Sequence, residues 1–153
     1  MLWLHLAHQA FFGAVAAAGF GVLFNFGPRA LFWCAAAGAL ALAVRTMGQD
    51  AGWSLELASF AAAVTTGCAM RLLREPLGPA GNAIALAGCI PMVPGAFFGQ
   101  AILGMFAVTG PHPENADVTV LLAMESMMRV TFTLAAIGAG LAIPSYLLRT
   151  RDF

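Results

Sequence analysis

The residues that could do chemistry in this chain gather around a break in a long, uncharged, apolar stretch. The break is the sequence IPMVPG at residues 90–95. Pro91 and Pro94 each remove a backbone donor and disfavour helix at the residue before them. The spacing therefore predicts two half-helices, at about residues 82–90 and 96–107. The free N–H groups that begin the second half-helix carry partial positive charge and suit an anion or a carboxylate.

Polar residues flank this break on both sides. Asn82 precedes it and Gln100 follows it. Backbone groups freed inside a bilayer must be satisfied by protein, water or a ligand, because lipid offers no partner. Asn82, Pro91, Pro94, Gly95 and Gln100 are therefore the predicted substrate-binding residues. Spacing alone also allows a simple proline kink that packs against neighbouring helices.

A second candidate group is charged. Glu125 and Arg129 are spaced i,i+4 in an apolar segment, so they share a helix face and can pair. Ionisable residues within a membrane are functional candidates by default. With Arg29, which we expect at a cytoplasmic entrance, they are the predicted gating or coupling residues. The alternative for Glu125 and Arg129 is a partly solvated ion pair near the membrane boundary.

Further polar residues lie near expected helix ends. His5, His8 and Gln9 open the first apolar segment, and His5 and Gln9 share a face. We interpret them as interfacial residues; the alternative is that a histidine or Glu125 carries a coupled proton. Asp50 is expected in a short loop, exposed to solvent.

The motifs of most enzyme and metal sites are missing from the sequence. Cys34, Cys68 and Cys89 have no metal-binding spacing and are interpreted as small apolar side chains. There is no nucleophile elbow, no pair of carboxylates suited to hydrolysis and no phosphate-binding loop, and the chain has no lysine. The net charge is zero, which gives no indication of nucleic acid binding. We predict neither an enzyme nor a metal or cofactor site.

The composition predicts an all-α integral membrane protein. Hydrophobic residues make up 61% of the chain and charged residues 9%, whereas a soluble domain has about 25% charged residues. A spanning helix needs about 20 residues. A single transmembrane domain over residues 1–153 is expected, a bundle of five helices with one broken by proline. The predicted spans are residues 6–26, 30–45, 54–71, 80–107 and 120–148. The second is short, so four spans are the alternative.

Basic residues indicate the orientation, because they collect in cytoplasmic loops. If all five segments span the membrane, most of the arginines lie on one side of it, and Arg45 lies near the boundary on the other side. The arginines on the first side are Arg29, Arg71, Arg74, Arg149 and Arg151. This predicts an N-terminus outside and a C-terminus inside, whereas four spans put both termini inside.

Three stretches of the chain resemble a known family. Residues 29–38 (RALxWCAxxG), preceded by Asn25, resemble the first hairpin of the small subunit of ThrE-type threonine/serine exporters. The PxxPG sequence of residues 91–95 is similar to that family's broken-helix motif. Residues 140–144 (GLxIP), followed by arginines, are similar as well. The likeness covers nearly the whole chain in length and in the order of segments.

The resemblance implies a subunit of a secondary-active exporter of small carboxylate metabolites in the bacterial inner membrane. Single-chain members export threonine and serine. In split members, a short chain like this one works with a larger membrane subunit, and succinate export is implied. The alternative is a subunit that only stabilises a membrane complex. Glycine- and alanine-rich faces on the first two segments suggest tight packing within the chain, to that partner or in a homo-oligomer.

Overall fold

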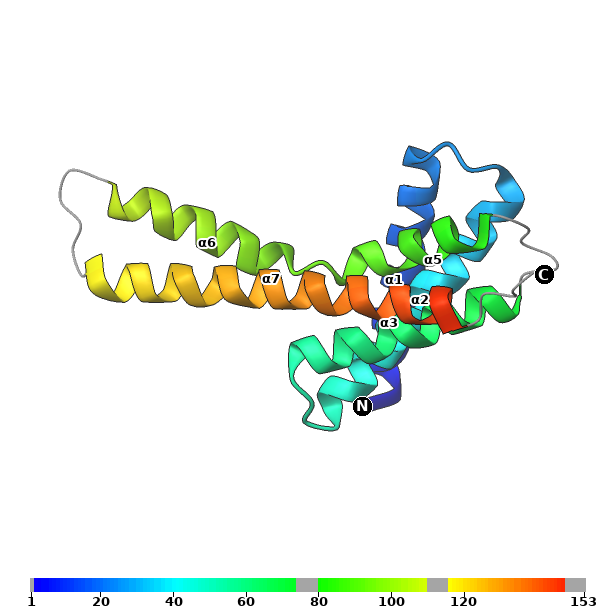
Figure 1. Ribbon diagram of the computed structural model, residues 1–153, viewed down its shortest axis with the longest axis horizontal. Helices are drawn as coiled ribbons and strands as arrows, with labels where there is room; N and C mark the ends of the chain where they lie inside the picture. The colour runs from blue at the N-terminus through cyan, green and yellow to red at the C-terminus, as the bar shows by residue number, and fades with distance from the viewer. Residues whose placement is uncertain (1, 74–79, 110–115, 148–153) are drawn as a thin grey trace. The chain divides into compact units, whose positions relative to one another are not determined.

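All the regular secondary structure is helical in the part of the chain that the computed structural model describes, which is residues 2–73, 80–109 and 116–147. Figure 1 shows the helices in chain order. Their bounds are α1 (Leu2–Leu23), α2 (Pro28–Asp50), α3 (Leu55–Leu72), α5 (Gly81–Cys89), the short 3-10 helix η2 (Ile90–Met92), α6 (Gly95–Val108) and α7 (Ala116–Leu147). The predicted all-α class is confirmed.

Several of these helices are long and apolar enough to cross a bilayer. Among the described residues, Trp3–Leu23, Pro28–Asp50 and Asp117–Leu147 qualify by themselves. Residues 81–92 and 95–107 qualify only together, and the 55° bend between them is that of a broken span or a re-entrant loop. The predicted class of integral membrane protein with one broken helix is thereby confirmed.

The number of spans and the orientation stay predictions. The orientation depends on Arg74, Arg149 and Arg151, which lie outside the described residues. The last residue of the expected span 120–148 also lies outside them.

Local sequence signals account for the ends of α2 and α3. Pro28 begins α2, where a first-turn proline loses no helical hydrogen bond. The helix continues past Arg45 and through Gly48 to Asp50, and it is followed by a turn in which Gly52 adopts a left-handed conformation with φ +84°. Ser54 then caps α3, since its hydroxyl oxygen accepts a hydrogen bond from the Leu57 N–H at 3.2 Å.

The chain forms two compact units. The first comprises residues 1–92 and 136–153, and the second comprises residues 93–135. The division falls between Met92 and Val93, inside the predicted break, so each unit is described by itself.

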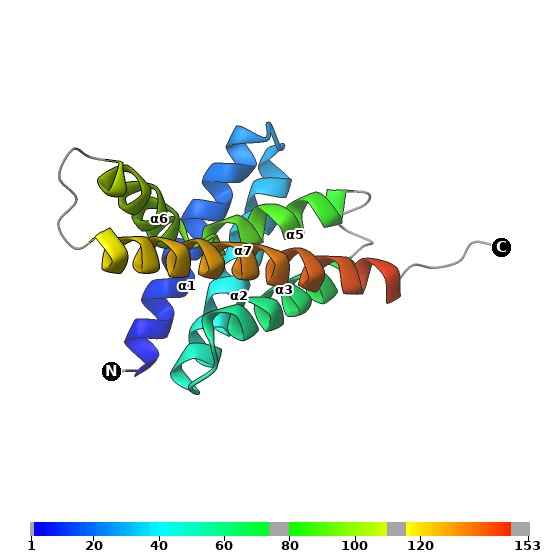
Figure 2. The same cartoon turned by 60° about the vertical axis from the view of Figure 1, so that its left-hand side comes forward.

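Small residues bring the helices of the first unit together. Helices α1 and α2 run side by side as an antiparallel pair in both views (Figures 1 and 2). A Cβ atom added at Gly13 would lie 2.6 Å from the Gly38 carbonyl oxygen, and one added at Gly88 of α5 would lie 2.9 Å from the Ala37 carbonyl carbon. Such close backbone approach is typical of helix packing in membranes.

The last turns of α7 complete this unit. A Cβ atom at Gly140 would lie 2.8 Å from the Phe60 carbonyl oxygen of α3, and one at Gly67 would lie 3.1 Å from the Pro144 ring. Pro144 is fully buried. Leu141 packs against both apolar clusters of the unit, so α3, α5 and the end of α7 share one core.

The second unit is a hairpin of α6 and the first part of α7. A Cβ atom added at Gly104 would lie 2.7 Å from the Ala123 Cβ. The Arg129 guanidinium lies 5.6 Å from the centre of the Phe97 ring. These contacts join the end of α6 to the start of α7, and the start of α6 to a later turn of α7, as in an antiparallel pair.

Candidate functional site

The break in the helix occurs where the proline spacing predicts it. Helix α5 ends at Cys89, η2 follows, and α6 begins at Gly95 after Pro94, which has φ −79° and ψ 68°. The Gly95 N–H donates to the Val93 carbonyl oxygen at 2.8 Å. The two predicted half-helices are therefore present, and the first N–H group of the second one is already bonded within the break.

Arg45 closes the carbonyl end of the first half-helix. Its Nη1 donates to the Met92 carbonyl oxygen at 2.6 Å, and the Met92 side chain is completely buried. A cation at a helix C-terminus is favourable, because the free carbonyl groups there carry partial negative charge. A residue of α2 thus satisfies a backbone group that the break leaves free.

The sequence interpretation missed this role of Arg45. It ended the second segment at Arg45 and expected the side chain near a membrane boundary. The available signal was weak: no proline follows Arg45 before Gly52, and although Gly48 lies between them, α2 continues to Asp50 and keeps Arg45 inside the helix. The partner, Met92, is 47 positions away and could not be read from local spacing.

A polar cavity of about 450 Å³ opens beside this contact. Residues of α1, α2 and η2 form its walls, and all belong to the first unit. They are His5, Gln9, Leu42, Arg45, Thr46, Gln49, Asp50 and Pro91. We call it the Arg45 cavity. It brings together one predicted substrate-binding residue, Pro91, and the polar residues His5 and Gln9 that the sequence placed at a helix start.

The polar groups of the Arg45 cavity are only partly bonded to one another. The His5 Nε2 lies 3.5 Å from the Gln9 Nε2 across one turn of α1. Thr46 is buried, with 7% of its surface exposed. In the part of the chain that the structure describes, no ion pair joins Arg45 to Asp50, although both line the cavity. The cavity therefore presents a cation and an anion that do not neutralise each other.

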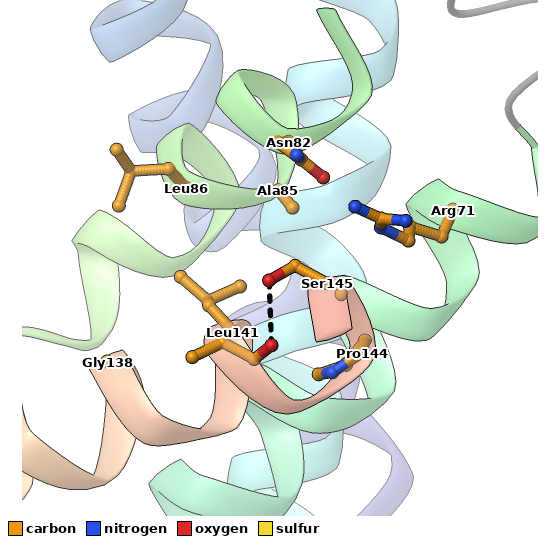
Figure 3. Close-up of a pocket in the computed structure, with 10 residues that line it drawn as sticks. Arg71, Asn82, Ala85, Leu86, Gly138, Leu141, Pro144 and Ser145 are labelled. Atoms are coloured by element: carbon orange, nitrogen blue, oxygen red, sulfur yellow. Dashed lines mark hydrogen bonds between the residues drawn. The ribbon is translucent and has the colours of Figure 1, made fainter. Parts of the chain in front are cut away.

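Asn82, another predicted substrate-binding residue, lines a different cavity of the first unit. This cavity has a volume of about 370 Å³ and lies between α3, α5 and the end of α7. Figure 3 shows Asn82 and Arg71 facing it together with Ser145. The Ser145 hydroxyl donates to the Ala142 carbonyl oxygen of its own helix at 2.7 Å, so it is already engaged.

The other predicted substrate-binding residues belong to the second unit. Pro94 is buried, whereas Gly95 and Gln100 are exposed on α6. A Cβ atom added at Gly95 would meet nothing within 4 Å. Of the five predicted residues, Pro91 lines the Arg45 cavity and Asn82 lines the cavity between α3, α5 and the end of α7. The other three lie at or near the start of α6.

The predicted pair of Glu125 and Arg129 is present on α7. Nε and Nη2 of Arg129 donate to the same carboxylate oxygen of Glu125, at 3.1 and 3.0 Å. The two side chains are 51% and 43% exposed. The spacing rule is confirmed, and the gating role stays a prediction. Arg29 lies exposed in the first turn of α2.

These features define an all-α membrane protein with a proline-broken helix beside a polar cavity. Comparison with known proteins is more specific. The model of the family described as "Threonine/Serine exporter, ThrE" matches residues 9–147, so the chain belongs to this family, as the sequence motifs predicted.

A relative from Haemophilus influenzae, described as an uncharacterized protein, is 31% identical over 149 residues. The match covers 94% of this chain and 48% of the relative. The chain therefore spans about half the length of the curated relative it matches. No solved structure matches the chain.

Proposed function

We propose that this protein is a subunit of a secondary-active exporter of small carboxylate metabolites, namely threonine and serine or succinate, in the bacterial cytoplasmic membrane. The observation that carries the proposal is the break between η2 and α6, whose carbonyl end is bonded to Arg45 beside a polar cavity. Interrupted helices are tolerated at membrane depth where they are buried in protein or line a cavity. In secondary transporters such interruptions form the substrate site.

The proposed substrate contacts are the residues that the sequence predicts around this break. Pro91 lines the Arg45 cavity, and Pro94 and Gly95 begin α6, whose N-terminal end suits a carboxylate. Gln100 on α6 and Asn82 on α5 offer amide groups to other polar parts of the substrate. We propose these five residues as substrate-binding.

Three charged residues complete the proposal. Arg29, exposed in the first turn of α2, attracts anions at the cytoplasmic entrance. Glu125 and Arg129 act as a gate or coupling pair, because breaking their contact would free two charges within an apolar helix.

A larger membrane subunit of the same family is the proposed partner. The support is the length of the Haemophilus influenzae relative, about half of which lies outside the match. Two chains that together supply both halves would give an assembly comparable with that relative.

The test is efflux of labelled threonine, serine and succinate from cells that express the chain with its partner. We expect efflux of at least one of these compounds above that of cells without the chain. The double substitution Pro91→Ala and Pro94→Ala is expected to abolish it, because a continuous helix would remove the free N-terminus of α6. Pro28→Ala is the matched control, since Pro28 lies exposed at the start of α2. Unchanged efflux in the double variant at normal protein level would contradict the role of the break.

The second candidate function is a stabilising subunit that does not itself transport. The tight glycine contacts of Gly13 with Gly38 and of Gly88 with Ala37 favour it, since they build a rigid scaffold. In that case the partner alone would transport once stabilised. Variants of the Arg45 cavity would then change efflux only in proportion to the amount of protein in the membrane.

A further inference from the structure

We infer that the Arg45 cavity is a binding site for a zwitterion, with the ligand's carboxylate at Arg45 and its cationic amino group at Asp50. The inference rests on the proposed export function and names the site and the ligand charge pattern that this function requires. Nothing in the sequence pattern indicated Arg45 or Asp50 as ligand-binding residues.

Arg45 has hydrogen-bond donors to spare. A guanidinium carries five N–H donors in a planar fork, and the described residues engage only Nη1, at the Met92 carbonyl. The Nε atom of Arg45 is buried without a hydrogen-bond partner. The Nη2 atom is neither buried nor engaged by the described residues, and a carboxylate is a good acceptor for its charge-assisted hydrogen bonds. The free donors therefore favour an anionic group in the cavity.

Asp50 supplies the opposite charge. It is the last residue of α2, where the free carbonyl groups already carry partial negative charge, so its carboxylate is not stabilised by the helix. A cation placed beside it would be attracted both by the side chain and by the helix end. No hydrogen bond or ion pair to another described residue occupies the Asp50 carboxylate.

The spacing of the two residues keeps them apart. Arg45 and Asp50 are five positions apart on α2, so they do not share the i,i+4 face on which helix ion pairs form. Their separation along the helix axis is about 7.5 Å. Two charge-assisted hydrogen bonds of about 3 Å each leave room between the side chains for a small molecule whose own charges lie close together. An α-amino acid has this charge pattern.

The rest of the cavity suits a small polar side chain. Gln9, Thr46 and Gln49 line it with amide and hydroxyl groups, which can exchange hydrogen bonds with a ligand hydroxyl. Its volume of about 450 Å³ lies in the usual range for small-molecule sites, about 300–1,000 Å³. A dicarboxylate would place its second negative charge near Asp50, and we expect it to bind less tightly.

The binding experiment uses the full chain purified with its partner in detergent and four probes. They are L-threonine, succinate, N-acetyl-L-threonine, which lacks the ammonium group, and L-threonine amide, which lacks the carboxylate. Titration calorimetry is expected to show L-threonine binding about tenfold or more tightly than each of the others, because each loses a charged hydrogen bond. Absence of L-threonine binding, or tighter binding of succinate, would overturn the inference.

Substitutions test whether Arg45 binds the carboxylate of the ligand and Asp50 binds its ammonium group. Arg45→Gln and Asp50→Asn are each expected to weaken L-threonine binding about tenfold to a hundredfold. Asp50→Asn removes no contact within the described chain, so it tests the site even if Arg45→Gln fails to fold. Glu56→Gln is the control, because Glu56 lies in the first turn of the neighbouring helix α3 and does not line the cavity. Unchanged affinity in Asp50→Asn would overturn the role of Asp50.

Transport assays distinguish failure of this site assignment from failure of the proposed export function. If Arg45→Gln and Asp50→Asn export labelled L-threonine at the unsubstituted rate, the assignment of the site is wrong and the export function stands. If the unsubstituted pair of subunits exports none of threonine, serine and succinate, the proposed function fails. L-threonine binding that depends on Arg45 and Asp50 would then still support the site.

Discussion

Each unit of this protein has an arginine in an apolar helix, and the two arginines differ in the kind of hydrogen-bond partner. Arg129, in the second unit, donates two hydrogen bonds to the carboxylate of Glu125, one turn away on the same helix. Arg45, in the first unit, donates to a backbone carbonyl on another helix element and has no carboxylate partner in the described chain. One charge is neutralised locally, whereas the other remains available.

This difference indicates which arginine can recognise a ligand. A ligand carboxylate at Arg129 would have to compete with Glu125 for the same guanidinium. At Arg45 it would add to an existing contact, because the described residues do not engage Nη2. The side chains of Glu125 and Arg129 are also about half exposed, so the pair contributes little energy by itself. Substitutions at Arg45 and at Arg129 are therefore expected to change efflux and stability by different amounts.

The largest effect is expected for Arg45→Met, which keeps an apolar stem and removes every donor. The Met92 carbonyl loses a charged hydrogen bond, which contributes about 1.5–3 kcal/mol, and the cavity loses its cation. We expect loss of L-threonine efflux and a lower thermal unfolding midpoint of the purified protein. Arg45→Lys, which keeps the charge but not the fork, is the control and should retain part of both. If Arg45→Met unfolds and exports like the unsubstituted protein, the contrast between Arg45 and Arg129 is wrong.

The packing of the two units offers the next test. A Cβ atom at Gly38 in the first unit would collide with the Gly13 carbonyl and with Ala17, whereas one at Gly99 in the second unit would meet nothing within 4 Å. Gly38→Ala is therefore expected to destabilise the protein by about 1–3 kcal/mol through overpacking. Gly99→Ala is expected to be neutral or slightly stabilising, because alanine is the better helix former. The midpoints of thermal unfolding of both variants in detergent measure the difference.

If both substitutions lower the midpoint equally, the close approach of α1 and α2 is not a main source of stability. A drop confined to Gly99→Ala would instead indicate that the α6 face packs tightly against another chain in the purified assembly.

Local rules in the sequence predicted the features that depend on neighbouring residues. The proline spacing gave the break between α5 and α6, and the i,i+4 rule gave the contact of Glu125 with Arg129. The contact of Ser54 with the Leu57 N–H at the start of α3 is local in the same way. In each case the interacting groups lie within a few residues, so backbone geometry alone determines whether they meet.

The Arg45 cavity could not be predicted in this way. It joins His5 of α1, Asp50 of α2 and Pro91 of η2, which are distant in sequence and meet only through the packing of three elements. The sequence interpretation also ended the second segment at Arg45, whereas α2 continues to Asp50. The family motifs indicated transport, but they did not indicate which charged residue contacts the broken helix.

The smallest effect is expected for the pair on α7, and it sharpens the contrast with Arg45. A double-mutant cycle of Glu125→Gln and Arg129→Gln should give a coupling free energy of less than about 1 kcal/mol, as for other exposed ion pairs. Thermal unfolding of the four proteins in detergent provides the stability differences, and efflux is measured alongside. If the pair gates transport, each single substitution changes the rate of efflux at constant protein level. A large coupling energy without any change in efflux would make the pair a structural contact, and Arg45 would then be the better candidate for the charge that responds to substrate.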